Sequence, residues 1–132
     1  MICSPTTFGL PDALLRDLAE KVAGLSFDSV TITRSTASDG PQIVFVNEAF
    51  TRLTGYAASD VIGQTPGVLQ GSKTDTATLK RLDETIERGE TFHGKAINYR
   101  KDGTPFEMEW KVTPLGSDGG ADYYMAVQRE AG

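Results

Sequence analysis

The sequence contains very few of the residues on which thiol, disulfide and metal chemistry depend. Its 132 residues include one cysteine, Cys3, and one histidine, His93. A single cysteine excludes an internal disulfide, a CxxC redox pair and a cysteine-ligated zinc site. The GxxxxGK[ST], HExxH and GxSxG motifs of common enzyme classes are also missing. These absences argue against an enzyme.

Long apolar runs and an excess of positive charge are absent as well. No segment approaches the roughly 18 consecutive apolar residues that a membrane span requires, and the first residues do not resemble a secretory signal. Thirteen lysines and arginines against eighteen aspartates and glutamates give a net charge of −5. This balance disfavours binding to nucleic acid or to an anionic membrane through a basic face. The sequence therefore predicts a soluble cytoplasmic protein.

The first 25 residues have the pattern of an amphipathic helix. Apolar residues recur there at helical spacing after Pro11 and Asp12, namely Leu14, Leu15, Leu18, Val22 and Leu25. The length of the chain fits one domain. We therefore expect a tail with an amphipathic helix over residues 1–25 and one domain over residues 26–130.

Five segments of that domain have the signals of β-strands. Val30 and Ile32 alternate with threonines, and the run from Ile43 to Val46 is apolar. Three more strands are expected over residues 91–99, 105–114 and 123–129. A tight turn at residues 101–103 joins the first two of these, and a looser segment over residues 116–122 joins the last two.

Short helices are expected between the second and third strands. Asn47 is a suitable N-cap for a helix that ends at Gly55, and Asp75 is suitable for one that ends at Gly89. A one-turn helix is expected over residues 59–62, and residues 63–73 are expected to be irregular. The order of elements predicts an α+β fold, with short helices on one face of a five-stranded antiparallel sheet.

Alternation sorts the side chains of the last three strands onto two faces. The expected inner face contains Phe92, Gly94, Ala96 and Asn98, then Phe106, Met108, Trp110 and Val112, then Tyr124, Ala126 and Gln128. A buried amide without a partner costs about 1–3 kcal/mol, so Asn98 and Gln128 favour a planar heterocyclic ligand. The alternative is that these amides bond to backbone, water or each other, and that the small residues only allow close packing.

The opposite face of these strands is apolar and requires a cover. Its members are Ile97, Tyr99, Tyr123, Met125 and Val127. The N-terminal helix and a second copy of the chain are the available candidates. We therefore expect a homodimer formed through this outer face and that helix.

Several motifs resemble those of PAS domains. QIVFVNEAF at residues 42–50, LTGY at 53–56 and VIG at 61–63 resemble the first half of a PAS domain, and NYRKDGTPF at 98–106 with Pro114 downstream resembles the second. GQTPGVLQG at 63–71, followed by Thr74 and Asp75, resembles the light-oxygen-voltage (LOV) branch, whose motif reads GxNCRFLQG. The resemblance covers residues 26–130 and implies a PAS fold.

LOV domains bind flavin mononucleotide (FMN) beneath the sheet, and the resemblance implies the same ligand here. Gln70, Asn98 and Gln128 match flavin-contacting positions of the family, Gln128 being the glutamine near the flavin N5 and O4 atoms. Thr65 matches the asparagine before the photoactive cysteine, and Met108 matches a second asparagine on the following strand. Flavin adenine dinucleotide, or no ligand, remains an alternative. Haem is disfavoured because His93 is expected on the face opposite Asn98.

The chain departs from the LOV pattern at the positions that carry the chemistry. Pro66 stands where the family has its photoactive cysteine, and Cys3 is distant in the sequence, so a cysteinyl-flavin adduct is not expected. Gly67 and Asp83 stand where the family has two phosphate-binding arginines. The available substitutes, by charge, are Lys73, Lys80 and Arg81.

Together these features predict a sensory module of the LOV type. It is expected to hold a flavin non-covalently, to respond by a redox change, and to signal through dimerisation or a partner chain. The alternative is a ligand-free PAS module that mediates protein association. Its support is the apolar outer face and the incomplete set of flavin contacts.

Overall fold

A computed structural model describes residues 17, 20–22, 25–38, 40–118 and 120–132. Five strands form one antiparallel sheet in the order β2-β1-β5-β4-β3. Their bounds are β1 (Ser29–Ser35), β2 (Gln42–Val46), β3 (Phe92–Tyr99), β4 (Pro105–Asp118) and β5 (Ala121–Glu130). The first and last strands are therefore neighbours at the centre of the sheet.

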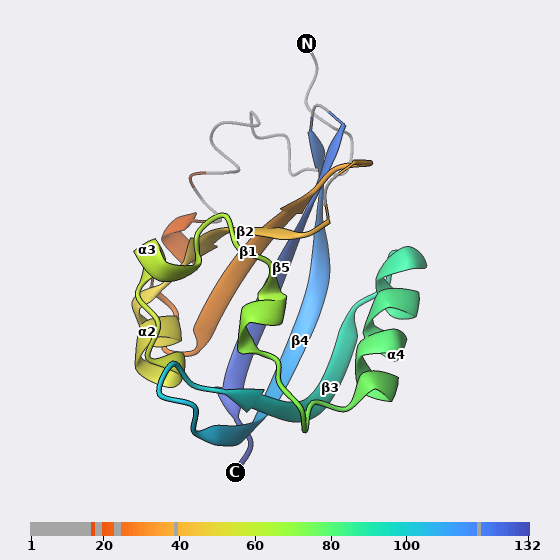
Figure 1. Cartoon of the computed structure of the whole chain (residues 1–132). Helices are drawn as coiled ribbons and strands as arrows, with labels where there is room; N and C mark the ends of the chain where they lie inside the picture. Colours follow the sequence, from red (N-terminus) through yellow and green to blue (C-terminus); the bar gives the residue numbers. More distant parts are fainter. Residues whose placement is uncertain (1–16, 18–19, 23–24, 39, 119) are drawn as a thin grey trace.

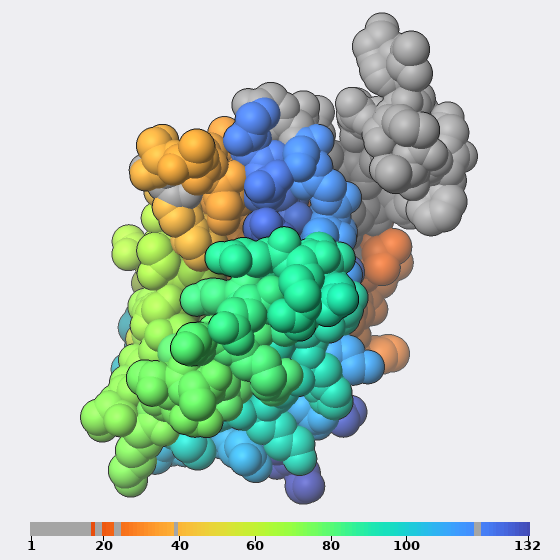
Figure 2. Space-filling view, turned by 90° about the vertical axis from the view of Figure 1, so that its right-hand side faces the viewer, coloured from red at the N-terminus to blue at the C-terminus, as the bar shows by residue number. Residues whose placement is uncertain are grey.

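Four short helices lie between β2 and β3 in the sequence and on one side of the sheet in space (Figure 1). They are α2 (Glu48–Thr54), α3 (Ala58–Val61), the 3₁₀ helix η1 (Pro66–Leu69) and α4 (Thr76–Glu87). Together α4 and its neighbour β3 form much of the surface seen in Figure 2. The α+β architecture expected from the sequence is confirmed.

Side-chain caps mark where α2 and α4 begin. The Oδ1 of Asn47 accepts a hydrogen bond from the Phe50 backbone N–H at 3.1 Å, and α2 ends at Gly55, whose φ of 80° is a left-handed conformation that suits glycine. Asp75 caps α4 in the same way through the Ala77 N–H. Both helices were expected at these places.

Two segments differ from the expected boundaries. The chain over residues 63–73 contains the 3₁₀ helix η1, which Pro66 opens at a position where the missing N–H costs nothing. β4 continues to Asp118, past the expected end at Pro114. The β4–β5 ladder has an irregularity between Pro114 and Gly116 and resumes with Gly116 opposite Tyr123.

The core lies between the inner face of the sheet and the helices. Several of its side chains are no more than 2% exposed and come from both layers, among them Val30, Ile43, Phe50, Val61 and Phe92. In β4, Phe106, Met108 and Trp110 are buried at 5%, 2% and 8% exposure. The alternation assigned to this strand from its sequence is thus confirmed.

The outer face of the sheet is half-buried. Ile97, Tyr123, Met125 and Val127 all have intermediate exposure. Tyr99 was expected on the apolar outer face, but it is covered by the chain itself. Its hydroxyl accepts a hydrogen bond from the Lys73 N–H, and its ring lies against Gly71.

Most of the expected N-terminal helix lies outside the described residues, although Val22 and Leu25 are described and are exposed at 58% and 80%. Among the described residues, the structure contains no helix long and apolar enough to cross a membrane.

Candidate functional site

Gln128 is held on the inner face by two hydroxyl groups of the neighbouring strand. It lies in β5, directly opposite Ser29 of β1 and Trp110 of β4. Its Oε1 accepts hydrogen bonds from Ser29 Oγ at 2.8 Å and from Thr31 Oγ1 at 2.9 Å. The residue is 7% exposed. The oxygen end of this amide is therefore fixed, and its nitrogen end points elsewhere.

Asn98 occupies the edge strand β3, opposite Phe106, and is 6% exposed. Its Nδ2 donates to the Ala96 carbonyl oxygen at 3.4 Å. A distance of 3.4 Å is long for an N–H···O bond, which is usually 2.7–3.2 Å. The side chain is thus buried but weakly held.

Each of these amides keeps one end available. Among the described residues, no hydrogen bond is found for the Asn98 Oδ1 or for the Gln128 Nε2. Every fully buried side-chain nitrogen or oxygen in the described part of the chain has a partner. These two atoms are therefore not sealed from solvent, and they can accept and donate a hydrogen bond to a ligand.

The two amides are too far apart to bond to each other. Gln128 and Asn98 lie two strands apart, about 10 Å across the sheet, and their β4 partners Trp110 and Phe106 differ by four positions, about 13 Å along it. This separation removes one of the alternatives left open by the sequence. It also means that a ligand contacting both amides must be extended.

Met108 lies between these amides, and the other two expected contacts lie apart from them. Met108 is opposite Ala96 and is 2% exposed. Thr65 and Gln70 flank η1 as its N-cap and C-cap residues, and both are exposed. The structure thus brings Asn98, Met108 and Gln128 onto one face and leaves Thr65 and Gln70 at the two ends of η1.

The space above Gly94 is filled by the protein itself. A Cβ atom at this position would lie 2.4 Å from the Phe92 ring and 2.8 Å from the Arg81 guanidinium. Arg81 reaches from α4 over the Phe92 ring, 4.5 Å from its centroid. Gly94 therefore permits close packing, which is the alternative that the sequence left open for the small residues of this face.

Two surface hollows border Gln128. One, of about 150 Å³, is lined on the outer side by His93, Glu109 and Arg129, and the other, of about 260 Å³, lies between Phe27, α2 and the end of β5. Neither is lined by Asn98, Met108, Thr65 or Gln70. Phe106, which is opposite Asn98, and Met108 instead belong to the packed core cluster of the inner layer.

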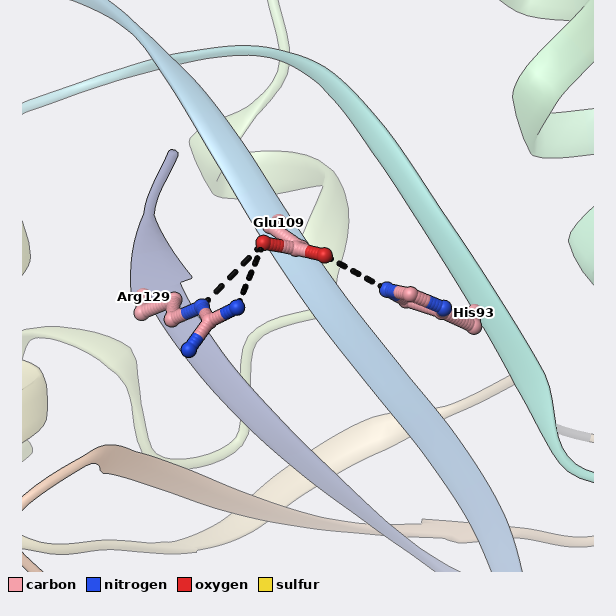
Figure 3. A network of polar contacts seen from close by, with 3 residues as sticks. All are labelled: His93, Glu109 and Arg129. Carbon is pink, nitrogen blue, oxygen red and sulfur yellow. Dashed lines mark hydrogen bonds and ion pairs between the residues drawn. The ribbon is translucent and has the colours of Figure 1, made fainter. Parts of the chain in front are cut away.

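His93 takes part in a polar network on the outer face (Figure 3). Its Nε2 lies 2.6 Å from one carboxylate oxygen of Glu109, and Arg129 donates to the other at 2.9 and 3.1 Å. The hydrogen bond with His93, followed by that with Arg129, holds the pKa of Glu109 below its ordinary value. As expected, His93 faces away from Asn98.

Ser29 and Thr31 were not identified from the sequence as site residues, although a signal was present. The first strand alternates serine and threonine with valine and isoleucine, which places both hydroxyls on one face. Only the pairing of β1 with β5 places that face beside Gln128. The pairing depends on tertiary structure and cannot be read from either strand alone.

Comparison with known proteins places this geometry in a family. The PAS domain family matches residues 28–130. Phototropin-2 of Oryza sativa subsp. japonica is 33% identical over 105 residues, which are 80% of this chain and 11% of that protein. The blue-light photoreceptor of Listeria monocytogenes is 34% identical over 114 residues, which are 86% of this chain and 45% of that protein. The chain thus spans less than half the length of these curated relatives.

A solved structure agrees with the sequence comparison. The LOV domain from a blue-light activated histidine kinase of Erythrobacter litoralis superimposes with a TM-score of 0.70 at 34% identity, over 80% of this chain and 96% of that domain. The strand order of the sheet and the short helices on one of its faces agree with this structural similarity. The chain belongs to the PAS domain family and is a homologue of LOV domains.

Proposed function

We propose that this chain is a LOV-type sensory module that binds a flavin non-covalently through the available ends of Gln128 and Asn98. The observation that carries the proposal is the orientation of Gln128. Because Ser29 and Thr31 hold its oxygen, its Nε2 is left to donate to a ligand. The homology with LOV domains of blue-light receptors supports a flavin as that ligand.

The residues present suit the ring of a flavin better than its phosphate. A flavin ring is extended and has hydrogen-bond donors and acceptors, which the available ends of the Asn98 and Gln128 amides complement. Met108 adds apolar contact between them. At the phosphate end, Gly67 and Asp83 provide no positive charge, and both are exposed. The polar side chains therefore provide contacts for the flavin ring and none for its phosphate at these two positions. FMN is proposed ahead of flavin adenine dinucleotide on homology alone.

When bound, the flavin supplies absorption of blue light and reversible reduction. The chain's own residues would respond to a change of protonation at the ring edge. Since Gln128 has one fixed and one available end, a new donor at the ring edge would favour rotation of its amide. Rotation would break the bonds from Ser29 and Thr31 and so alter the β1–β5 pairing.

The proposed response does not use a cysteinyl adduct. Pro66, at the start of η1, occupies the position of the photoactive cysteine. Its ring has no nucleophile. We therefore propose that an external electron donor, such as a thiol or an amine in solution, reduces the photoexcited flavin, and that dioxygen reoxidises it in the dark.

An absorption spectrum of the full chain, purified after expression and again after incubation with FMN, tests this proposal. We expect the structured blue band of a protein-bound flavin, released as intact flavin on denaturation. Under illumination without air and with an electron donor in the buffer the band should bleach, and admission of air should restore it. Absence of flavin uptake in both preparations contradicts the proposal, as does a bleached state that persists unchanged in air.

A second candidate function is protein association without a ligand. It is supported by the apolar side chains of the outer face, where Ile97, Met125 and Val127 are half-buried. A homodimer through this face would bury them further. Sedimentation at several concentrations tests it, and replacement of Met125 by Glu should weaken self-association. A monomer at all concentrations excludes the homodimer.

A further inference from the structure

Arg100, the first residue after β3, contacts three elements at one end of the sheet. Its Nε donates to the Leu53 carbonyl oxygen in the last turn of α2 at 3.1 Å, and its Nη2 donates to a Glu130 carboxylate oxygen at the end of β5 at 2.7 Å. The guanidinium carbon also lies 4.3 Å from the centroid of the Phe106 ring in β4. One half-buried cation therefore joins a helix end to two strands.

The ion pair with Glu130 passes over β4 on the inner side of the sheet. Phe106 is opposite Asn98 of β3, and Glu130 is opposite Met108 of β4. Phe106 and Met108 are two positions apart and both buried, so they face the same layer. β3 and β5 are not neighbours in the sheet, because β4 lies between them. The Arg100 side chain therefore bridges two strands that are not paired with each other.

The end of α2 depends on the turn between β3 and β4 for its hydrogen bonds. The last carbonyl groups of a helix have no partner within the helix. In α2 the Leu53 carbonyl accepts from Arg100 Nε, and the Thr54 carbonyl accepts from the Lys101 N–H at 2.9 Å. α2 and the end of β5 also border the hollow of about 260 Å³, so the packing between them is incomplete. Arg100 therefore contributes a direct polar link between these two elements.

We propose that Arg100 is a latch that couples the end of β5 to the last turn of α2, so that the two segments open and close together in the native protein. Glu130 holds the guanidinium in the orientation that directs Nε to the Leu53 carbonyl. Loss of the carboxylate contact lets the side chain turn away, and the hydrogen bond to α2 weakens as well. A change that frees the end of β5 is thus transmitted to α2 across β4. The coupling belongs to the chain without a ligand and does not depend on flavin binding.

Hydrogen exchange of the full chain without ligand tests the latch through two backbone amides, one in each coupled segment. The Gly55 N–H bonds to the Thr51 carbonyl at the end of α2, and the Ala131 N–H bonds to the Glu107 carbonyl just after β5. Residues 108–112, in the interior strand β4, serve as the reference for global unfolding. A latch predicts that the protection of both amides changes together relative to this reference.

Two variants open the latch from different sides. Arg100→Met keeps apolar contact with Phe106 and removes both polar contacts. We expect it to lower the protection of Gly55 and Ala131 about two- to fivefold, a modest factor because the ion pair is partly exposed. Glu130→Met removes the carboxylate and leaves Arg100 in place. It should lower the protection of Gly55 about twofold, as well as that of Ala131, although the hydrogen bond to α2 is not itself removed.

Lys101→Met is the matched control on the same turn. It removes the ion pair with Asp60 at 3.0 Å and leaves the Arg100 contacts in place, so Ala131 should keep its wild-type protection. A loss at Ala131 equal to that in Arg100→Met would show that any change in this turn loosens β5, and it would overturn the proposal.

Combination of Arg100→Met with Glu130→Met separates a latch from two independent contacts. With the guanidinium gone, loss of the carboxylate should have no further effect on the Gly55 amide. Unchanged protection of Gly55 in the single variant Glu130→Met means that the two contacts act independently, and this result overturns the latch. A further fall at Gly55 in the double variant, as large as that in the single variant, does the same.

Discussion

Ser29 and Gln128 lie directly opposite each other in β1 and β5, and the serine hydroxyl donates to the glutamine carbonyl oxygen at 2.8 Å. Both residues are buried, at 3% and 7% exposure. Thr31, two residues along the same face, donates to the same oxygen. The three side chains thus form one unit across the central pair of strands.

Replacement of Gln128 by Leu should destabilise the fold because it leaves two buried hydroxyls without an acceptor. We expect a loss of about 1–3 kcal/mol in the free energy of unfolding, measured with urea. In a background of Ser29→Ala and Thr31→Val the same replacement should cost less, since no hydroxyl is then left unpaired. Equal losses in the two backgrounds would show that the hydrogen bonds do not couple these residues.

Replacement of Gly94 by Ala tests the close packing on the inner face. The added methyl group would overlap the Phe92 ring and the Arg81 guanidinium. Overpacking of this kind typically costs about 1–3 kcal/mol, and thermal unfolding should report it. Gly40→Ala is the matched control, because a Cβ atom at residue 40 has no neighbour within 4 Å. A neutral Gly94→Ala would mean that Phe92 and Arg81 move aside without penalty.

The Arg81 guanidinium lies over the Phe92 ring on the inner side of β3, and we propose it as a contact for the phosphate of the proposed FMN. The Arg81→Met variant keeps apolar contact with Phe92 but removes the charge. We expect FMN affinity to fall about tenfold or more and riboflavin affinity to stay unchanged. Titration by flavin fluorescence measures both. Lys80→Met, on the exposed side of α4, is the control. A parallel loss for FMN and riboflavin would assign Arg81 a packing role alone.

Asn47 connects α2 to the first strand as well as capping the helix. Its Oδ1 accepts from the Val30 and Phe50 backbone N–H groups, and its Nδ2 donates to the Asp28 carbonyl. Asn47→Ala should therefore lose about 2 kcal/mol or more, above the typical loss of about 1 kcal/mol for a cap. Asn47→Asp retains the acceptor and loses the donor, so chemical unfolding should rank it between wild type and Asn47→Ala.

Acid should unfold the protein through its hydrogen-bonded carboxylates. Hydrogen bonds from the Ala57 N–H and then from Lys101 lower the pKa of Asp60. The Thr78 hydroxyl and the Ala77 N–H lower the pKa of Asp75. Hydrogen bonds with His93 and then Arg129 lower the pKa of Glu109. A group with a lowered folded-state pKa stabilises the fold above its unfolded-state pKa, and this contribution is lost as pH falls through the folded-state value. We therefore expect stability to fall below about pH 4.5, as measured by urea unfolding at a series of pH values. Asp60→Asn should flatten this acid dependence, and an unchanged slope would contradict the assignment.

The sequence was informative wherever one strand or one helix end decides the outcome. The alternation in β4 identified Phe106, Met108 and Trp110 as inward-facing, and the caps Asn47 and Asp75 placed two helices. Local chemistry determines these features. The same reasoning placed Asn98 and Gln128 on the buried face.

Features that depend on pairing between distant segments could not be predicted in this way. The hydroxyls that hold Gln128 come from a strand 99 and 97 positions earlier in the sequence. The filling of the space at Gly94 requires the position of α4 relative to β3. The continuation of β4 to Asp118 depends on pairing with β5 beyond Pro114. In each case the deciding contact is tertiary.

The central position of the β1–β5 pair has a mechanical consequence. The first residue of β1 is paired with Gln128, near the last residue of β5, so segments attached at these two places leave from the same end of one ladder. Tension between such segments acts along the hydrogen bonds, which run across the strands, and therefore loads them one after another. The β1–β5 ladder should separate from the Ser29–Gln128 pair at low force, and the hydrogen bonds of the Gln128 side chain would be among the first to break.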